Sequence, residues 1–193
     1  MALWIKICGL RNTESIDAAI EAGADAVGFV FAPSPREVTL NEAAPLVNHA
    51  RGRAEIVAVM RHPRMAWITE VCACIQPDWL QSDAPDLHGV MLAGRVTALP
   101  VYRDDAPSDP PPRLLFEGAD SGTGDTCDWS VAAALSLRTE LILAGGLNPE
   151  NVTAGITAVR PFGVDVSSGV ERTRGRKDPN LIFDFVQAAR AAA

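Results

Sequence analysis

The chain has 193 residues, 48% of them hydrophobic and 21% charged, and its formal net charge is −7. This size and composition fit one globular domain, 1–193, and the acidic balance argues against a nucleic-acid partner, since such surfaces need clustered basic charge. No apolar run approaches the roughly 20 residues that span a bilayer, and the first residues lack a secretory signal, so we expect a cytoplasmic protein with no membrane partner.

Short apolar runs alternate with helical patterns along almost the whole chain. Near-continuous apolar runs of this length are typical of parallel strands that are buried on both faces. The eight predicted strands are 4–7, 26–31, 56–60, 79–81, 96–102, 114–116, 141–144 and 164–167.

The first two predicted helices carry clear start signals. Asn12 can cap a helix over 13–22, where its side chain would accept a hydrogen bond from a free backbone N–H. Thr39 and Glu42 have the spacing of a capping box for the second helix. Pro45 then falls inside that helix and is a local misfit, because proline has no backbone N–H to donate.

The later helices show similar signals. Asp128 can cap 129–138, and Asn–Pro and Asp–Pro pairs at 148–149 and 178–179 predict two further helix starts. Strand–helix units in series therefore run from one end of the chain to the other.

Eight such units predict an α/β fold, either a closed (β/α)8 TIM barrel or a doubly wound sheet, and we expect the barrel. The chain is slightly short for a full barrel. The segment 104–112 contains four prolines, which exclude a regular helix, so we expect helix 5 to be missing or replaced by a Pro-rich loop. A domain boundary there is a weaker alternative, because neither half would close a sheet by itself.

Barrel enzymes carry their chemistry on the loops after the strands. Cys8 follows the first strand; it is either a small core residue or a proton carrier, since an ordinary thiol titrates at about 8.5. Arg36 follows the second strand and could hold a carboxylate through two hydrogen bonds, or be a solvated surface residue. The cysteines and histidines show no metal-ligand spacing, so we predict no metal.

Two donor-rich loops follow the last two strands. Gly145 and Gly146 lead into a helix start, and Ser167, Ser168 and Gly169 offer further N–H and hydroxyl donors. Loops at these two places commonly bind phosphate in barrels, although each could be only a tight turn. The Gly-rich segment 118–124 lacks the Lys and Ser/Thr of a P-loop and is interpreted as a loop after the sixth strand.

Strand alternation also predicts one buried ion pair. It places Lys6 on the same side as Cys8, and Asp165 on the same side as Ser167. The first and eighth strands are neighbours in a closed barrel, and two buried charges must pair because an isolated one is very costly. We therefore expect contact between Lys6 and Asp165.

The segments KICGLRN, GADAVGFVFAPSPR, LAGGLNPENV and VRPFGVDVSSGVE resemble the phosphoribosylanthranilate isomerases of tryptophan biosynthesis. These matches occur in both halves of the chain and in the same order. The middle, 77–112, is the least similar part.

The resemblance implies an Amadori rearrangement of N-(5-phosphoribosyl)anthranilate to 1-(2-carboxyphenylamino)-1-deoxyribulose 5-phosphate, with no cofactor. It implies Cys8 as general base and Arg36 as the partner of the anthranilate carboxylate. The phosphate would be held by Gly145, Gly146, Ser167, Ser168 and Gly169. The expected partner is this small-molecule substrate, and the expected assembly is a monomer or homodimer.

Two positions depart from the family pattern. After the fourth strand the family has Q-L-H-G, whereas this chain has Gln81 to Ala84, so Asp83 replaces a rim histidine. At the end of the sixth strand an aspartate is the family's general acid, and Glu117 is the nearest carboxylic acid here. We predict Glu117 as the acid, with Phe116 packed outside the barrel; a solvated Glu117 is the alternative. Lys6, Gln81, Asp83 and Asp165 are further pocket candidates.

Two other functions are compatible with these features. One is another phosphosugar barrel, such as an indole-glycerol-phosphate synthase or a pentose-phosphate epimerase, but neither the Lys–Glu set nor the metal-binding histidines are evident. The other is a phosphate-binding barrel without catalysis, against which the retained Cys8 argues.

Overall fold

A computed structural model describes residues 2–103, 105–118 and 127–193. Eight parallel strands form a closed barrel in sequence order, and the last strand pairs with the first. The strands are β1 (Trp4–Cys8), β2 (Ala26–Val30), β3 (Glu55–Val59), β4 (Trp79–Asp83), β5 (Thr97–Arg103), β6 (Arg113–Glu117), β7 (Glu140–Leu143) and β8 (Gly163–Val166). The predicted (β/α)8 barrel is confirmed. The Gly-rich segment 118–124 lies almost entirely outside the described residues.

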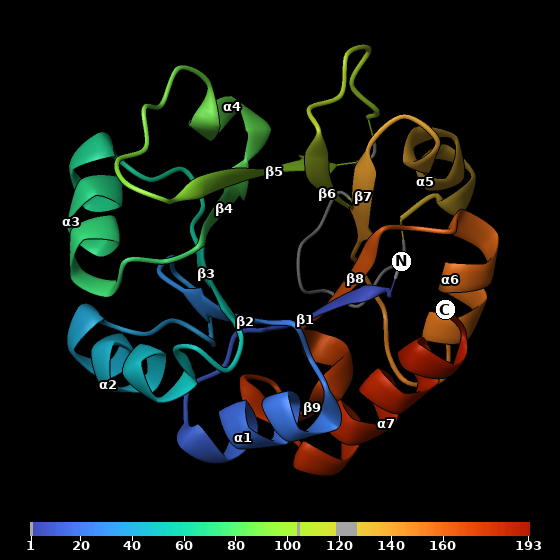
Figure 1. Ribbon diagram of the computed structural model, residues 1–193, viewed down its shortest axis with the longest axis horizontal. Helices are drawn as coiled ribbons and strands as arrows, with labels where there is room; N and C mark the ends of the chain where they lie inside the picture. Colours follow the sequence, from blue (N-terminus) through green and yellow to red (C-terminus); the bar gives the residue numbers. More distant parts are fainter. Residues whose placement is uncertain (1, 104, 119–126) are drawn as a thin grey trace.

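Helices lie around the outside of the ring of strands (Figure 1). They are α1 (Thr13–Ala22), α2 (Leu40–Ala50), α3 (Met65–Ile75), α4 (Ala84–Leu87), α5 (Trp129–Ser136), α6 (Val152–Val159) and α7 (Pro179–Ala191). The predicted cap of α1 forms, since the side chain of Asn12 accepts a hydrogen bond from the backbone of Ser15 at 2.8 Å. The capping box of Thr39 and Glu42 also forms, and α2 continues through Pro45.

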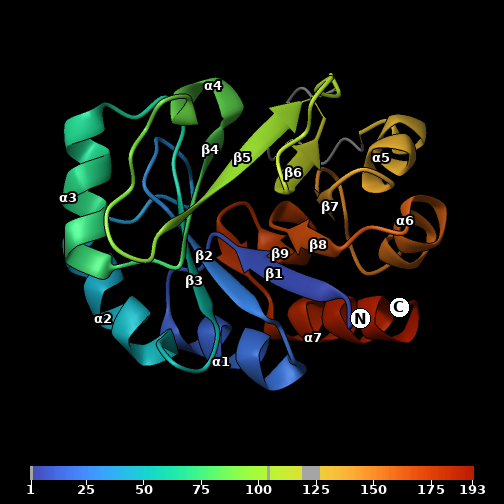
Figure 2. The ribbon, with the colours of Figure 1, turned by 45° about the horizontal axis from the view of Figure 1, so that its top comes forward.

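The connection from β5 to β6 is the irregular part of the barrel. The two strands lie side by side and point the same way (Figure 2). Among the described residues of this connection, 105–112, none is helical. The prolines have the predicted effect, and helix 5 is replaced by a loop. The preceding helix, α4, is itself only a single turn.

The core has two layers because successive strand residues point to opposite faces. One layer fills the space between strands and helices; there Phe116 packs in one cluster with Leu135 of α5, as predicted. The other layer fills the barrel interior and includes Trp4, Leu99 and Ile142. Lys6 and Cys8 alternate with Ile5 and Ile7 and share the inner side with Trp4.

One local prediction was wrong. Asn148 does not cap α6, which begins at Val152; its side chain instead accepts hydrogen bonds from the backbone of Glu150 and Asn151, which makes a separate turn. The last helix, α7, starts after Asp178 as predicted, but elements that the sequence analysis did not predict lie between β8 and α7. A short 3-10 helix, η1 (Ser168–Val170), is followed by a hairpin of β9 (Glu171–Thr173) and β10 (Arg176–Lys177).

Over the described residues, no helix combines the length and the apolar character needed to cross a bilayer.

Candidate active site

A cavity of about 310 Å³ lies at the carboxyl ends of the barrel strands. Its lining includes seven of the residues that the sequence predicted for the site: Cys8, Arg36, Gln81, Asp83, Glu117, Asp165 and Ser167. A larger hollow of about 840 Å³ lies at the opposite end, beside Leu3, Glu140 and Phe162, where the strands begin. We assign the site to the smaller cavity, because barrels place their chemistry at the carboxyl ends of the strands.

Cys8 ends β1 and its thiol lines the cavity while remaining buried. The neighbouring Gly28 makes room for it, since a Cβ at that position would lie only 3.2 Å from the Cys8 Sγ. Burial raises the pKa of the thiol above its usual value, and the cations of Lys6 and Lys177 oppose that increase. The thiol also packs in a small buried cluster with Val30 and Ala32, so the position of Cys8 is compatible with both of its predicted roles.

Behind the thiol lies the predicted ion pair. Lys6 and Asp165 are register partners on β1 and β8, and Lys6 Nζ lies 2.7 Å from Asp165 Oδ1. The Lys6 side chain has no exposed surface, so the partner is needed to offset the loss of its hydration. Burial lowers the pKa of Lys6, but Asp165 and Cys8 outweigh that effect and raise it overall.

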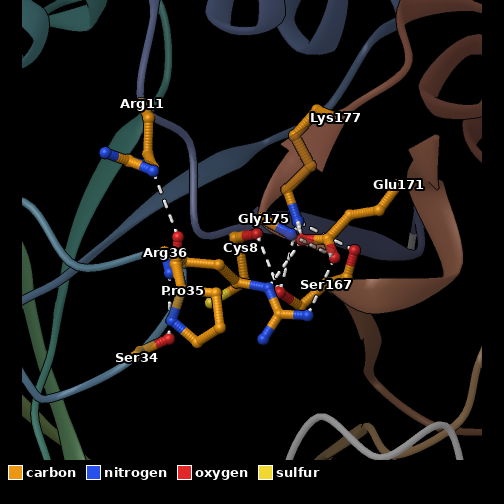
Figure 3. A network of polar contacts seen from close by, with 9 residues as sticks. All are labelled: Cys8, Arg11, Ser34, Pro35, Arg36, Ser167, Glu171, Gly175 and Lys177. Carbon is orange, nitrogen blue, oxygen red and sulfur yellow. Dashed lines mark hydrogen bonds and ion pairs between the residues drawn. The ribbon is translucent and has the colours of Figure 1, made fainter. Parts of the chain in front are cut away.

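Arg36 is only 8% exposed, which rules out a solvated surface residue. Its Nε donates to Glu171 Oε1 at 2.6 Å and its Nη2 donates to Glu171 Oε2 at 2.9 Å. Glu171 belongs to β9, so the loop after β2 and the hairpin after β8 are joined at the mouth of the cavity (Figure 3). The unpredicted hairpin thus supplies the partner of a predicted residue.

Lys177, like Glu171, is a site residue that the sequence interpretation missed. Its side chain is 2% exposed, and its Nζ donates to Ser167 O at 2.8 Å, Ser167 Oγ at 3.2 Å and Glu171 Oε1 at 3.0 Å. Burial lowers the pKa of Lys177, against the attraction of Glu171. No sequence signal marks Lys177, whereas Glu171 ends one of the segments that resemble the isomerases.

The loops after β7 and β8 touch each other. Gly145 and Gly146 have φ of 82° and 62°, a region that favours glycine. Gly169 allows the close approach, since a Cβ there would lie 1.9 Å from the carbonyl oxygen of Leu147. The cavity lining includes Ser167 but not Gly145, Gly146, Ser168 or Gly169. The predicted phosphate loops are therefore adjacent, at the edge of the cavity.

Across the barrel, Glu117 ends β6 and forms an ion pair with Arg103, its register partner on β5. Arg103 also donates to Asp83 Oδ1, from Nη2 at 2.6 Å and from Nε at 3.0 Å. Burial lowers the pKa of Arg103, but Glu117 and Asp83 raise it overall. The sequence interpretation missed Arg103, although it comes directly after the predicted fifth strand, where site residues are expected.

Gln81 lies on β4, two residues before Asp83, with 7% of its surface exposed. Among the described residues, no hydrogen-bond partner is present for its Oε1. An unpaired buried amide is costly, so a bound donor would be stabilising here.

Among the residues that the structure describes, one group of side chains could hold a metal ion: His62, Asp83 and Asp86, at the rim of the barrel. His62 Nδ1 lies 3.0 Å from Asp86 Oδ1, but its side chain is 67% exposed. Asp83 is already paired with Arg103 and lies 3.9 Å from Arg61. The guanidinium groups of Arg61 and Arg103 would compete with a metal ion for Asp83, which argues against a metal site here.

Comparison with known proteins gives a consistent result. A profile of the family described as N-(5'phosphoribosyl)anthranilate (PRA) isomerase matches residues 5–188. The N-(5'-phosphoribosyl)anthranilate isomerase of Afipia carboxidovorans is 39% identical over 217 aligned residues, covering 100% of this chain and 92% of the relative. The crystal structure of phosphoribosyl anthranilate isomerase from Thermotoga maritima is similar, with a TM-score of 0.84, 31% identity and coverage of 98% and 99%. A second structure, of phosphoribosyl anthranilate isomerase in complex with reduced 1-(o-carboxyphenylamino)-1-deoxyribulose 5-phosphate, has a TM-score of 0.80, 30% identity and the same coverage.

Proposed function

The chain belongs to the N-(5'-phosphoribosyl)anthranilate isomerase family, and from that premise we propose that it isomerises N-(5'-phosphoribosyl)anthranilate in tryptophan biosynthesis. The product is 1-(2-carboxyphenylamino)-1-deoxyribulose 5-phosphate. One observation supports the assignment of this reaction to particular residues. The thiol of Cys8, the guanidinium of Arg36 and the carboxyl group of Glu117 line a single cavity.

We propose that the substrate is held at its two anionic ends. The anthranilate carboxylate meets Arg36, which still has N–H groups beyond the two that bind Glu171. The phosphate lies at the touching loops after β7 and β8, near Gly145, Gly146, Ser167, Ser168 and Gly169. Fixing both ends would orient the sugar between Cys8 and Glu117, and such orientation lowers the barrier of the chemical step.

The proposed reaction begins with Glu117, which protonates the ring oxygen of the furanose. The lone pair of the anthranilate nitrogen forms a C=N bond to C1′ as the C1′–O bond breaks, which gives an open-chain Schiff base. Cys8, as a thiolate, then removes the proton from C2′ and leaves an enolamine. Tautomerisation of the enolamine to the ketone gives the product.

The ion pair with Arg103 bears directly on the role of Glu117. A neighbouring guanidinium favours the carboxylate form of Glu117, whereas a general acid must carry a proton. We propose that the negative charge of the substrate, bound at Arg36 and at the loops after β7 and β8, disfavours the carboxylate form, so that Glu117 takes up a proton from water when the substrate binds. Asp83 would keep Arg103 in place after Glu117 is protonated.

Cys8 faces the opposite requirement, because a base must be unprotonated when the substrate arrives. Burial disfavours the thiolate, and the two buried lysines, Lys6 and Lys177, favour it. We propose that these lysines keep enough thiolate present for catalysis. A reducing compartment is also needed to keep the thiol free, which supports the cytoplasm as its location. The assembly, a monomer or homodimer, remains a prediction.

A turnover assay with the purified chain tests the proposal. Incubation with N-(5'-phosphoribosyl)anthranilate should remove the fluorescence of that compound, and the ketose product should appear by mass spectrometry. Binding of the substrate by the folded chain without any conversion would contradict the proposal. That outcome would favour the alternative of a phosphate-binding barrel without catalysis.

A further inference from the structure

The network around Glu171 contains more positive than negative charge. Arg36 and Lys177 both donate to Glu171, and the three side chains are 9%, 2% and 4% exposed respectively. Burial raises the pKa of Glu171, but the two hydrogen bonds from Arg36 and the charge of Lys177 lower it overall, so Glu171 is a carboxylate. Lys177 uses its Nζ on three acceptors, as an ammonium group does. Two cations and one anion leave one positive charge without a partner inside the network.

Glu171 is held from all sides. Its Oε1 accepts from Arg36 Nε at 2.6 Å and from Lys177 Nζ at 3.0 Å. Its Oε2 accepts from Arg36 Nη2 at 2.9 Å and from the backbone N–H of Gly175 at 3.0 Å. With both oxygens engaged twice, the carboxylate has a fixed position and offers a rigid surface to Arg36.

The paired hydrogen bonds between Arg36 and Glu171, which together form a fork, fix the orientation of the arginine. A guanidinium is planar, so two parallel hydrogen bonds along its Nε–Nη2 edge set the plane of the whole group. The other edge, between Nη1 and Nη2, keeps its donors and can form a second fork with another carboxylate. Figure 3 shows one terminal nitrogen of Arg36 pointing away from Glu171, and Arg36 lines the cavity.

The same network reaches the strand that carries the thiol. Lys177 donates to the backbone oxygen and the hydroxyl of Ser167, and that hydroxyl donates to the backbone oxygen of Cys8 at 3.1 Å. Through Lys177 and Ser167, Glu171 therefore connects Arg36, the proposed partner of the substrate carboxylate, with Cys8, the proposed base.

We propose that Glu171 is a positioning residue that sets the specificity for a substrate carboxylate, by holding the guanidinium of Arg36 with its outer edge toward the cavity. The substrate carboxylate would also balance the excess positive charge of the network. This inference rests on the proposed function, because it requires Arg36 to bind the anthranilate carboxylate.

Calorimetric binding to two ligands tests the inference without using turnover. One ligand is reduced 1-(o-carboxyphenylamino)-1-deoxyribulose 5-phosphate, and the other is the same compound without the ring carboxylate. The ratio of the two affinities is measured for the native chain, Arg36→Ala, Glu171→Gln and the double variant. The native ratio should be about tenfold or more, because hydrogen bonds to charged groups contribute at least that much to binding.

The expected result is a loss of discrimination, not a general loss of binding. Arg36→Ala and Glu171→Gln should each lower the affinity ratio severalfold, and the double variant should match Arg36→Ala. A merely structural role would weaken both ligands equally in Glu171→Gln and leave the ratio unchanged, and that outcome overturns the inference. If Arg36→Ala itself leaves the ratio unchanged, the carboxylate site of the proposed function fails instead.

A second variant covers the case in which Glu171→Gln does not fold, as judged by circular dichroism. Glu171→Asp keeps the charge next to Lys177, but its shorter side chain reaches only part of the Arg36 fork. Its affinity ratio should lie between those of the native chain and Arg36→Ala. A full native ratio in a folded Glu171→Asp chain would contradict the proposed positioning role.

Discussion

The two walls of the cavity are built differently. The Cys8 side consists of Lys6, Cys8, Arg36, Asp165, Ser167, Glu171 and Lys177, and its charged side chains are at most 9% exposed. The Glu117 side consists of Gln81, Asp83, Arg103 and Glu117, and its charged side chains are 14–21% exposed. Apart from Lys177, the residues of the Cys8 side lie in the segments that resemble the isomerases, whereas the Glu117 side contains both positions at which the sequence departs from that resemblance.

The difference follows from what supports each wall. The Cys8 side lies on β1 and β8, the loop after β2 and the β9–β10 hairpin; the full helix α7 packs against β1 and against α1, and Glu171 and Lys177 of the hairpin bind Arg36 and Ser167. The Glu117 side lies on β4, β5 and β6, where α4 is one turn and the β5–β6 connection has no helix among its described residues. A wall with fewer helices behind it leaves its charged side chains more exposed to water. Breaking an ion pair there therefore costs less free energy of unfolding than breaking a buried pair.

The largest expected effect is on the Cys8 side. Cys8→Ala should lower kcat by about 10²–10⁴-fold, the usual contribution of a general base, because alanine cannot accept a proton. Turnover is measured by the loss of substrate fluorescence. Cys74→Ala, at an exposed cysteine of α3, is the matched control and should keep native turnover. Near-native activity in Cys8→Ala would remove the thiol from the mechanism.

The buried ion pair behind Cys8 should dominate stability. Asp165→Asn leaves Lys6 buried without its counter-charge, and breaking such a pair costs about 3–5 kcal/mol of the free energy of unfolding. Urea denaturation followed by circular dichroism measures this loss.

The matched change on the Glu117 side is Asp83→Asn. Arg103 keeps Glu117 as a partner and is partly exposed, so the loss should stay within about 1 kcal/mol. Equal losses in Asp165→Asn and Asp83→Asn would show that burial does not distinguish the two walls.

Glu117→Gln tests the acid on the less buried wall. Glutamine keeps the shape but cannot deliver a proton, so kcat should fall by about 10²-fold, at the lower end of the range for acid–base catalysis. Glu14→Gln, at an exposed glutamate of α1, serves as the control. Substantial turnover in Glu117→Gln would place the acid elsewhere, and Asp83 would be the next candidate; Asp120 and Asp125 lie outside the described residues.

The smallest expected effect is a shift in pH dependence. Because the pKa of Cys8 is raised, the thiolate fraction, and with it the rate of alkylation by iodoacetamide, should keep rising above the pH at which free cysteine levels off. Lys177→Met removes a cation that lowers this pKa, so the rise should move to still higher pH. Mass spectrometry of the peptide that contains Cys8 gives the rate. An unchanged profile in a folded Lys177→Met chain would exclude that electrostatic effect.

The sequence by itself determined the barrel and most of the Cys8 side. Strand alternation and the closure of an eight-stranded barrel were enough to pair Lys6 with Asp165, although 159 positions separate them. Four prolines were enough to remove a helix. These predictions succeeded because side-chain alternation and proline geometry depend only on a short segment of the chain. Strand order, in turn, follows directly once the barrel topology is known.

Only the tertiary structure decided how the site's charges pair. Arg36 meets Glu171 across 135 positions, and Arg103 lies between Asp83 and Glu117, yet each charged residue had several possible partners in the sequence. The β9–β10 hairpin and the late start of α6 were also missed, since an Asn–Pro pair permits either a helix cap or a separate turn. Long side chains on separate loops reach whatever partner packing brings within hydrogen-bond distance, and local sequence patterns carry no record of that distance.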